Sequence, residues 1–167
     1  NAGEVVIVIT NEAWEEKPGK CLRESLAREH IALPQDEPLF NLVNVPHDGF
    51  KSIFKTTRNI IQTRISPNVD STGVFFKDNV WAYPQAVVII QVKDTEEFIK
   101  VFDENRDNIL RYFLKAEKDR LIMNYEKYYE KAVYNVLDEE FGITMKVAPG
   151  FQIASRGEDL LWLRYET

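Results

Sequence analysis

The chain lacks the residue patterns on which several common functions depend. Cys21 is the only cysteine in 167 residues, so no intramolecular disulfide can form. No run of about eighteen apolar residues occurs, so the sequence predicts no membrane-spanning helix. The seven glycines stand singly, whereas a phosphate-binding loop needs clustered glycines that let backbone amides approach an anion. Nucleotide binding by the usual loops is therefore not predicted.

Histidines are also scarce, and their positions carry no catalytic or metal-binding pattern. His30 and His47 are the only two, and they do not form a zinc-binding pair at helical spacing. No glycine-flanked serine occurs for acyl transfer, and Cys21 has no neighbouring base in sequence. We expect Cys21 to be a small buried apolar residue. The sequence thus predicts no catalytic residue, no metal ligand and no cofactor.

One fragment resembles a calcium loop, and it fails at the remaining positions. Asp103, Asn105 and Asp107 stand at the first, third and fifth positions of such a loop. The sixth position, which should be glycine, is Asn108, and the twelfth, which should be glutamate, is Leu114. We interpret the fragment as a polar helix junction.

The charge balance argues against a nucleic-acid partner. Acidic residues outnumber basic ones by 27 to 21, so the chain carries a net charge of -6 and repels a polyanion unless its bases gather on one face. The basic residues do not cluster in this way, because basic and acidic residues alternate between residues 115 and 131. This alternation is typical of a solvated helix face.

Apolar runs and turn residues predict strands and short helices. The β-branched run EVVIVIT at residues 4–10 predicts a strand that is buried on both faces. Further strands are predicted at 39–45, 59–66, 86–92, 143–148, 150–154 and 160–165, a hairpin between 74–77 and 80–83, and short helices at 20–29 and 49–57.

A stretch without glycine or proline, from Gln85 to Phe141, predicts a long helical region after the strand at 86–92. Asp94 and Glu97 have the spacing of a capping box, so we expect the helix to begin near Thr95. Apolar residues then recur at steps of three, four or seven and form one stripe. Because residues 103–108 contain no apolar side chain and offer new caps, we expect a kink or break there.

Together these elements predict an α+β fold and one compact domain over residues 1–167. We expect a mixed, largely antiparallel sheet, with the long, kinked helical region packed across one face and two shorter helices. Residues 1–2 precede the first strand without a methionine, so we interpret them as the remainder of a cloning scar or of processing.

Two groups of residues are candidates for binding. His47, Lys55, Arg58 and Asn59 flank one short helix and predict a polar pocket, although Lys55 and Arg58 also suit a helix C-terminus. The second group is aromatic: Trp81, Tyr83, Tyr125 and Tyr129 are candidates for contact with a partner protein or a glycan.

Four segments carry a family resemblance: PLFNLVNVPHDGFKSIFKTTRNIIQTRIS, DNVWAYPQAVVIIQV, FLKAEKDRLIMNYEK and LLWLRYET. They resemble segments of the Bacteroidetes lipoproteins grouped as domain of unknown function 4837, in order and over nearly the whole chain. The resemblance implies the N-terminal half of a longer exported protein, held at the cell envelope by a lipid on a cysteine upstream of residue 1. Membrane contact would occur through that lipid alone. The resemblance implies no activity and no functional residue.

Three functional hypotheses follow. The first is a non-enzymatic envelope module that binds a protein partner or a glycan, and it predicts exposed tyrosines and an exposed Trp81. The second is a hydrolase of envelope material with unmarked carboxylate or histidine catalysts, which predicts a cleft where two carboxylates, or His47 and a carboxylate, converge with perturbed acidity. The third is a structural scaffold for a C-terminal half, which predicts a large exposed apolar patch.

Overall fold

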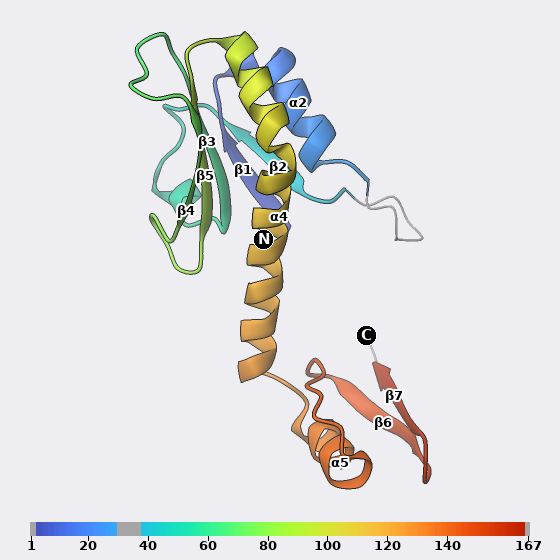
Figure 1. The fold of residues 1–167 in the computed structure, drawn as a ribbon. Helices are drawn as coiled ribbons and strands as arrows, with labels where there is room; N and C mark the ends of the chain where they lie inside the picture. Colours follow the sequence, from blue (N-terminus) through green and yellow to red (C-terminus); the bar gives the residue numbers. More distant parts are fainter. Residues whose placement is uncertain (1–2, 30–37, 166–167) are drawn as a thin grey trace. The chain divides into compact units, whose positions relative to one another are not determined.

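The computed structural model describes residues 3–29 and 38–165, which divide into two compact units (Figure 1). Unit 1 comprises residues 1–117 and unit 2 residues 118–167. The sequence predicts one compact domain over residues 1–167, whereas the contacts within the structure group into these two units. Residues 1–2, the expected cloning scar, lie outside the described residues.

A five-stranded sheet forms the centre of unit 1. Its strands are β1 (Glu4–Val8), β2 (Asn41–Val45), β3 (Asn59–Ile65), β4 (Gly73–Asp78) and β5 (Ala86–Val92), in the order β2-β1-β3-β5-β4. β2, β1, β3 and β5 run parallel, and β4 pairs antiparallel with β5 at the edge. The predicted mixed sheet is confirmed, but it is mostly parallel rather than largely antiparallel.

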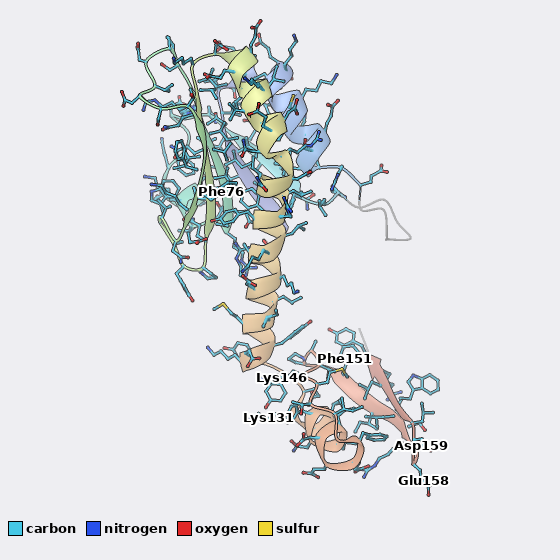
Figure 2. The ribbon with its side chains drawn as sticks, in the orientation of Figure 1. Phe76, Lys131, Lys146, Phe151, Glu158 and Asp159 are labelled. Carbon is cyan, nitrogen blue, oxygen red and sulfur yellow. The ribbon has the colours of Figure 1, made fainter. Side chains whose placement is uncertain are left out.

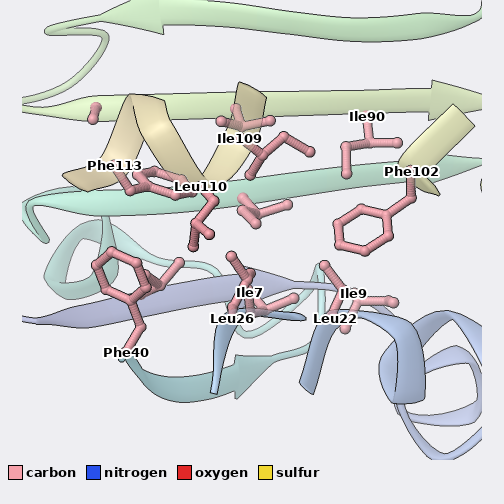
Figure 3. Packing of buried hydrophobic residues seen from close by; sticks show 14 of the residues in the cluster. Ile7, Ile9, Leu22, Leu26, Phe40, Ile90, Phe102, Ile109, Leu110 and Phe113 are labelled. Carbon is pink, nitrogen blue, oxygen red and sulfur yellow. The ribbon is translucent and has the colours of Figure 1, made fainter. Parts of the chain in front are cut away.

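Two helices cover one face of this sheet, α2 (Lys17–Leu26) and the first half of α4 (Thr95–Lys127), which lie side by side in Figure 1. Alternate residues of β1, β3 and β5 meet these helices in the main core, shown in Figure 3. Leu22 and Leu26 of α2 and Phe102 and Phe113 of α4 are all fully buried there. The packing confirms the expected long helix on one sheet face.

The opposite face of the sheet has a much thinner cover. Val6, Val8, Val45, Ile60 and Val87 form a second buried cluster. Phe50 and Phe54 pack on that cluster from the connection between β2 and β3, which contains only a four-residue helix, α3 (Ser52–Lys55). A parallel sheet usually carries long helices on both faces, so this face is unusually open.

The helix α4 starts where the sequence predicts. The Glu97 amide donates to Asp94 Oδ1 at 2.8 Å, and the Lys93 amide donates to Glu97 Oε2 at 2.7 Å, as in a capping box. The expected kink at 103–108 is wrong, because α4 is continuous from Thr95 to Lys127. Phe102 and Ile109 stay buried on either side, so the polar run is the solvent-facing side of one helix.

Unit 2 contains the end of α4, the helix α5 (Lys131–Phe141), and a hairpin of β6 (Phe151–Arg156) and β7 (Leu161–Tyr165). Gly142 ends α5 in the left-handed conformation, with φ 64. Lys146 donates to Glu126 Oε2 at 2.7 Å, and this hydrogen bond raises the pKa of its ammonium; Figure 2 labels Lys146 in this unit. In the described part of unit 2 only Val133 and Leu137 are buried apolar residues.

Several predicted elements differ from the structure. The predicted hairpin between 74–77 and 80–83 is wrong, because β4 pairs with β5 and residues 79–85 form the connecting loop. No strand occurs at 143–148, while the strands predicted at 59–66, 86–92 and 160–165 correspond to β3, β5 and β7. The helix α1 (Asn11–Glu15) was not predicted. None of the helices in the described residues is both long and apolar enough to cross a membrane.

Candidate functional site

Unit 1 contains a crevice at the carboxyl ends of the parallel strands. Its volume is about 550 Å³, and its wall is formed by the end of β3 and by the segments that follow β1, β2 and β5. The lining residues follow β1 (Ile9, Thr10, Glu12, Ala13 and Glu16), follow β2 (His47), belong to β3 (Thr63, Arg64 and Ile65) and follow β5 (Thr95). The crevice is therefore a product of the sheet topology, which brings four separate segments to one edge.

The strand order explains why space opens at this edge. From β1 the chain passes through α1 and α2 to β2 on one side, whereas β3 lies on the other side of β1. The connections beside β1 and β3 thus leave in opposite directions, and a crevice forms between them at the carboxyl ends. Ligands of open α/β sheets bind at such a reversal of strand order.

Two hydrogen bonds build the floor of the crevice around Thr63. This threonine is buried, and its hydroxyl donates to the Val8 carbonyl of β1 at 2.8 Å. Its own carbonyl accepts a hydrogen bond from His47 Nε2 at 2.6 Å. Because a carbonyl only accepts, Nε2 of His47 carries a proton, and Nδ1 is the acceptor when the ring is neutral.

The helix α1 forms the wall beside β1 and is fixed at both ends. The side chain of Thr10 caps its start and accepts from the Ala13 amide at 3.2 Å. The guanidinium of Arg23 donates to the Trp14 carbonyl at 2.7 Å and lies 4.6 Å from the centre of the indole ring. Gly19 permits the close contact of α2 with the end of α1, because a Cβ at Gly19 would lie 1.8 Å from the Trp14 carbonyl oxygen.

Acidic and basic residues are both among those that line the crevice. Glu12, Glu16 and Arg64 are exposed, and within the described part of the chain their side chains form no hydrogen bond or ion pair. Ile9, Ala13 and Ile65 add an apolar wall. The crevice can therefore receive a molecule that is partly apolar and partly charged.

The structure separates His47 from the other residues of the predicted polar pocket. His47 lies in the crevice, while Asn59 begins β3, roughly 13 Å away from Thr63 along the strand. Asn59 is fully buried and donates to the Glu4 carbonyl at 3.0 Å and to Glu117 Oε1 at 2.6 Å. Lys55 and Arg58 precede Asn59 at that amino end. The pocket predicted from these four residues is therefore wrong.

The four aromatic candidates belong to different units. Trp81 and Tyr83 lie in the loop between β4 and β5 of unit 1, where Tyr83 is 74% exposed and Trp81 packs edge-on against Phe50 at 5.4 Å. In unit 2, Tyr125 and Tyr129 are half-buried, and Tyr129 packs on Tyr134 at 5.2 Å. Only the first pair is exposed to the degree that a contact surface requires.

The loop with Trp81 and Tyr83 is held rigidly by Gln85, which is buried. The side-chain amide of Gln85 donates to the carbonyls of Lys55 and Thr57 at 2.8 and 2.7 Å. Its side-chain oxygen accepts from the Trp81 amide at 3.0 Å. These bonds hold the loop against the end of α3, and the exposed residues Trp81 and Tyr83 of the loop and Ile53 of α3 are here together called the aromatic surface.

A smaller hollow of about 280 Å³ lies between β4 and α4 in unit 1. Phe76, labelled in Figure 2, packs edge-on against Tyr112 at 5.1 Å, and Arg111 lines the same hollow. The Tyr112 hydroxyl already donates to the Lys77 carbonyl or to Asp78 Oδ1, both at 2.7 Å. The hollow is thus the rim of a packing contact and offers less space than the crevice.

Cys21 is a packing residue, as expected. It lies half-buried against the main core, and burial, together with Asp103 and Glu24, raises the pKa of its thiol. A raised pKa disfavours the nucleophilic thiolate. Among the described residues, no group of three or more His, Cys, Asp or Glu side chains could hold a metal ion.

Sequence reasoning missed most of the crevice because it expected a largely antiparallel sheet. In such a sheet the ends of β1, β2, β3 and β5 would not share one edge. The available signal was the pair of continuous β-branched runs at 4–10 and 86–92, which is typical of buried parallel strands. Thr10 is the last residue of the first run, where a ligand-binding turn would begin.

Comparison with known families identifies one match. The family model described as Domain of unknown function (DUF8532) matches residues 1–126, which include the whole crevice. No curated protein and no solved structure matches the chain significantly.

This match corrects the resemblance seen in the sequence. Assignment to domain of unknown function 4837, among the Bacteroidetes lipoproteins, is wrong, because residues 1–126 match a different family. A location at the cell envelope and an upstream lipid anchor rested on that resemblance alone, so both lose their basis.

Proposed function

We propose that this chain, which belongs to the family described as Domain of unknown function (DUF8532), is a non-enzymatic module that binds a small polar molecule in the crevice of unit 1. One observation carries the proposal: a crevice of about 550 Å³ lies where the strand order reverses and is lined by the end of β3 and by the segments that follow β1, β2 and β5. Pockets that take small molecules span roughly 300–1,000 Å³ and favour this place in open α/β sheets.

The side chains in the crevice favour binding over catalysis. Hydrolysis by a His-activated nucleophile needs a hydroxyl or thiol whose proton the histidine can take. The buried hydroxyl of Thr63 is engaged, since it donates its proton to the Val8 carbonyl, while the Thr10 oxygen caps α1 by accepting from the Ala13 amide. His47 itself is oriented by a backbone carbonyl.

A hydrolase remains the second candidate, on a specific observation. His47, Glu12 and Glu16 are all among the residues that line the crevice, which supports this candidate. A glutamate can activate water without a protein nucleophile. Hydrolysis of a molecule that binds in the crevice, abolished in Glu12→Gln or His47→Asn, would favour this candidate over the binding module.

A protein or glycan partner, the leading hypothesis from the sequence, is supported by the aromatic surface rather than by the crevice. Ile53, Trp81 and Tyr83 are exposed in unit 1, and Gln85 holds their loop in place. Exposed aromatic side chains are enriched in protein interfaces and stack on sugar rings. This surface is distinct from the crevice, so both kinds of binding are compatible in one module.

The crevice is tested by a screen of small polar molecules against the full-length 15N-labelled chain. We expect binding molecules to shift the amide resonances of residues 9–16, 47 and 63–65. Ala13→Met narrows the crevice and should abolish these shifts, while Ala82→Met, at another half-buried alanine of unit 1, should not. Shifts that persist in Ala13→Met, or that cluster around Trp81 instead, would refute the proposed site.

A further inference from the structure

We infer that the open edge of β4 binds an extended peptide as an additional antiparallel strand, and that the peptide residue opposite Phe76 is acidic. The inference concerns a surface separate from the crevice, so it goes beyond the proposed function. It rests on two observations: a regular sheet edge with outward-pointing backbone groups, and a hollow beside this edge whose charged residues are basic.

The strand β4 forms a regular edge of the sheet (Figure 1). It pairs with β5 along one side, and the register runs without a shift from residue 73 to residue 78. Its last four residues are exposed, and Phe75 and Phe76 are among them. Native edge strands are protected by prolines, bulges, charged residues or a covering segment. Within the described residues β4 has only the charged pair Lys77 and Asp78, so its edge is a template for strand addition.

The hydrogen-bond pattern identifies the backbone groups of β4 that point outward. The Asn79 amide donates to the Gln85 carbonyl at 2.9 Å, so these two residues form a hydrogen-bonded pair. Such pairs alternate with non-bonded pairs in an antiparallel ladder, so Lys77 bonds to β5 whereas Phe76 does not. By the same alternation the amides and carbonyls of Val74 and Phe76 point away from β5. An added antiparallel strand can exchange two hydrogen bonds with each of these residues.

The hollow of about 280 Å³ lies on the α4 side of this edge. The lining residues of α4 are Asn108, Arg111, Tyr112 and Lys115, whose spacing of three and four places them on one side of the helix. Phe76 lines the hollow from β4, and its ring packs on Tyr112 at 5.1 Å. Paired residues of neighbouring strands point to the same sheet face about 5 Å apart. The peptide residue paired with Phe76 would therefore place its side chain at the hollow.

The charge around the hollow favours an acidic side chain. Among the described residues that line it, the charged ones are Arg111 and Lys115, and both are exposed. The Arg111 guanidinium donates from Nη2 to Asn108 Oδ1 at 2.8 Å, which holds it on the side of α4 where Asn108 lines the hollow. A guanidinium has five N–H donors, so it can bind a carboxylate at the same time. An acidic side chain on the peptide thus meets a basic wall.

The test uses the 15N-labelled 167-residue chain and nine-residue peptides with the sequence Lys-Thr-Val-Thr-Glu-Thr-Val-Thr-Lys, blocked at both ends. One peptide variant carries glutamine in place of the central glutamate. Two others carry an N-methyl group, either on the amide of the central residue or on that of the next residue. Dissociation constants are measured from the amide shifts of Val74 and Phe76. The protein variants are Arg111→Gln and the matched control Arg106→Gln, at an exposed arginine of α4 outside the hollow.

We expect the glutamate peptide to shift the amides of Val74 and Phe76 and to leave the crevice amides unshifted. The glutamine peptide should bind about three- to fivefold more weakly, as expected for an exposed ion pair. Arg111→Gln should remove this preference for glutamate, and Arg106→Gln should retain it. A merely structural effect of Arg111→Gln would weaken both peptides equally.

The N-methyl peptides test the strand pairing itself. In the antiparallel arrangement the central amide points toward β4 and the next amide points away. Methylation of the central amide should therefore abolish binding, while methylation of the next amide should change it less than about twofold, because that amide has no partner in β4.

Four results would overturn the inference. Equal binding of the glutamate and glutamine peptides to the wild type would refute the acidic residue. Equal loss of binding by the two N-methyl peptides would refute antiparallel addition, and no shift at the solubility limit of the peptide would refute a peptide site at this edge. Shifts of Val74 and Phe76 with protein concentration alone would show that a second copy of the chain occupies the edge instead.

Discussion

Replacement of Gly19 by alanine tests how the wall of the crevice is built. Gly19 is buried in α2, where α2 passes the end of α1. A Cβ at this position would lie 1.8 Å from the Trp14 carbonyl oxygen and 2.6 Å from the Trp14 Cα, and both are backbone atoms that no rotamer change can move. Ordinary contact needs about 3.5 Å, so α1 and α2 would have to separate by roughly 1.5 Å.

Two effects of opposite sign compete in Gly19→Ala. Alanine favours a helix over glycine by about 1 kcal/mol. The clash of the added Cβ with the Trp14 backbone, in contrast, lowers the free energy of unfolding by about 1–3 kcal/mol. Displacement of Trp14 also weakens the bond from Arg23 to the Trp14 carbonyl, now 2.7 Å, and a hydrogen bond to a charged group contributes about 1.5–3 kcal/mol. We therefore expect a net destabilisation of about 2–3 kcal/mol.

The measurement is urea unfolding followed by the amide resonances of unit 1, because two units can unfold separately. Lys20→Ala is the matched control at the next residue, since Lys20 is exposed and its surface ion pair with Glu24 contributes little. Gly19→Ala should also shift the resonances of Glu12 and Ala13 in the folded state. A stabilisation of about 1 kcal/mol, as helix propensity alone predicts, would refute the close contact of α1 and α2.

Three further predictions concern unit 1. Gln85→Leu should destabilise it by about 3 kcal/mol in urea unfolding, because the carbonyls of Lys55 and Thr57 and one amide lose their partner; a loss below 1 kcal/mol would contradict the role of this side chain. Phe102→Ala should lower the free energy of unfolding by about 3–5 kcal/mol, because Phe102 is fully buried and stacks on Phe98. An effect as small as that of a surface substitution would contradict the core packing. Asp103→Asn should lower the pKa of Cys21, whose thiol should then react faster with iodoacetamide at pH 8, and an unchanged rate would rule out the interaction.

The parts of the fold that depend on local sequence were predictable. The capping residues Asp94 and Glu97 marked the start of α4 correctly, because cap geometry is local. The strand at 86–92 was equally clear, since its β-branched residues have no helical period. The kink predicted at 103–108 is wrong, because cap-forming residues on the exposed side of a long helix do not interrupt that helix when Phe102 and Ile109 remain in the core.

The strand order was not predictable, and the site depends on it. Tertiary contacts such as those of Gln85 decide whether β4 pairs with β5 or with residues 80–83. Likewise, the parallel arrangement of β1, β3 and β5 depends on the connections between them, including β4 between β3 and β5, and not on any one segment. Of the crevice, only His47 was singled out, and for a different pocket.

The most direct test of the crevice is a crystal structure of the 167-residue chain with the molecule that shifts the crevice resonances most strongly in the screen. The proposed function predicts electron density for that molecule in the crevice, in contact with residues such as Ile9, His47 and Thr63. Density for the ligand at another place, such as beside Trp81 and Tyr83, with none in the crevice, would contradict it.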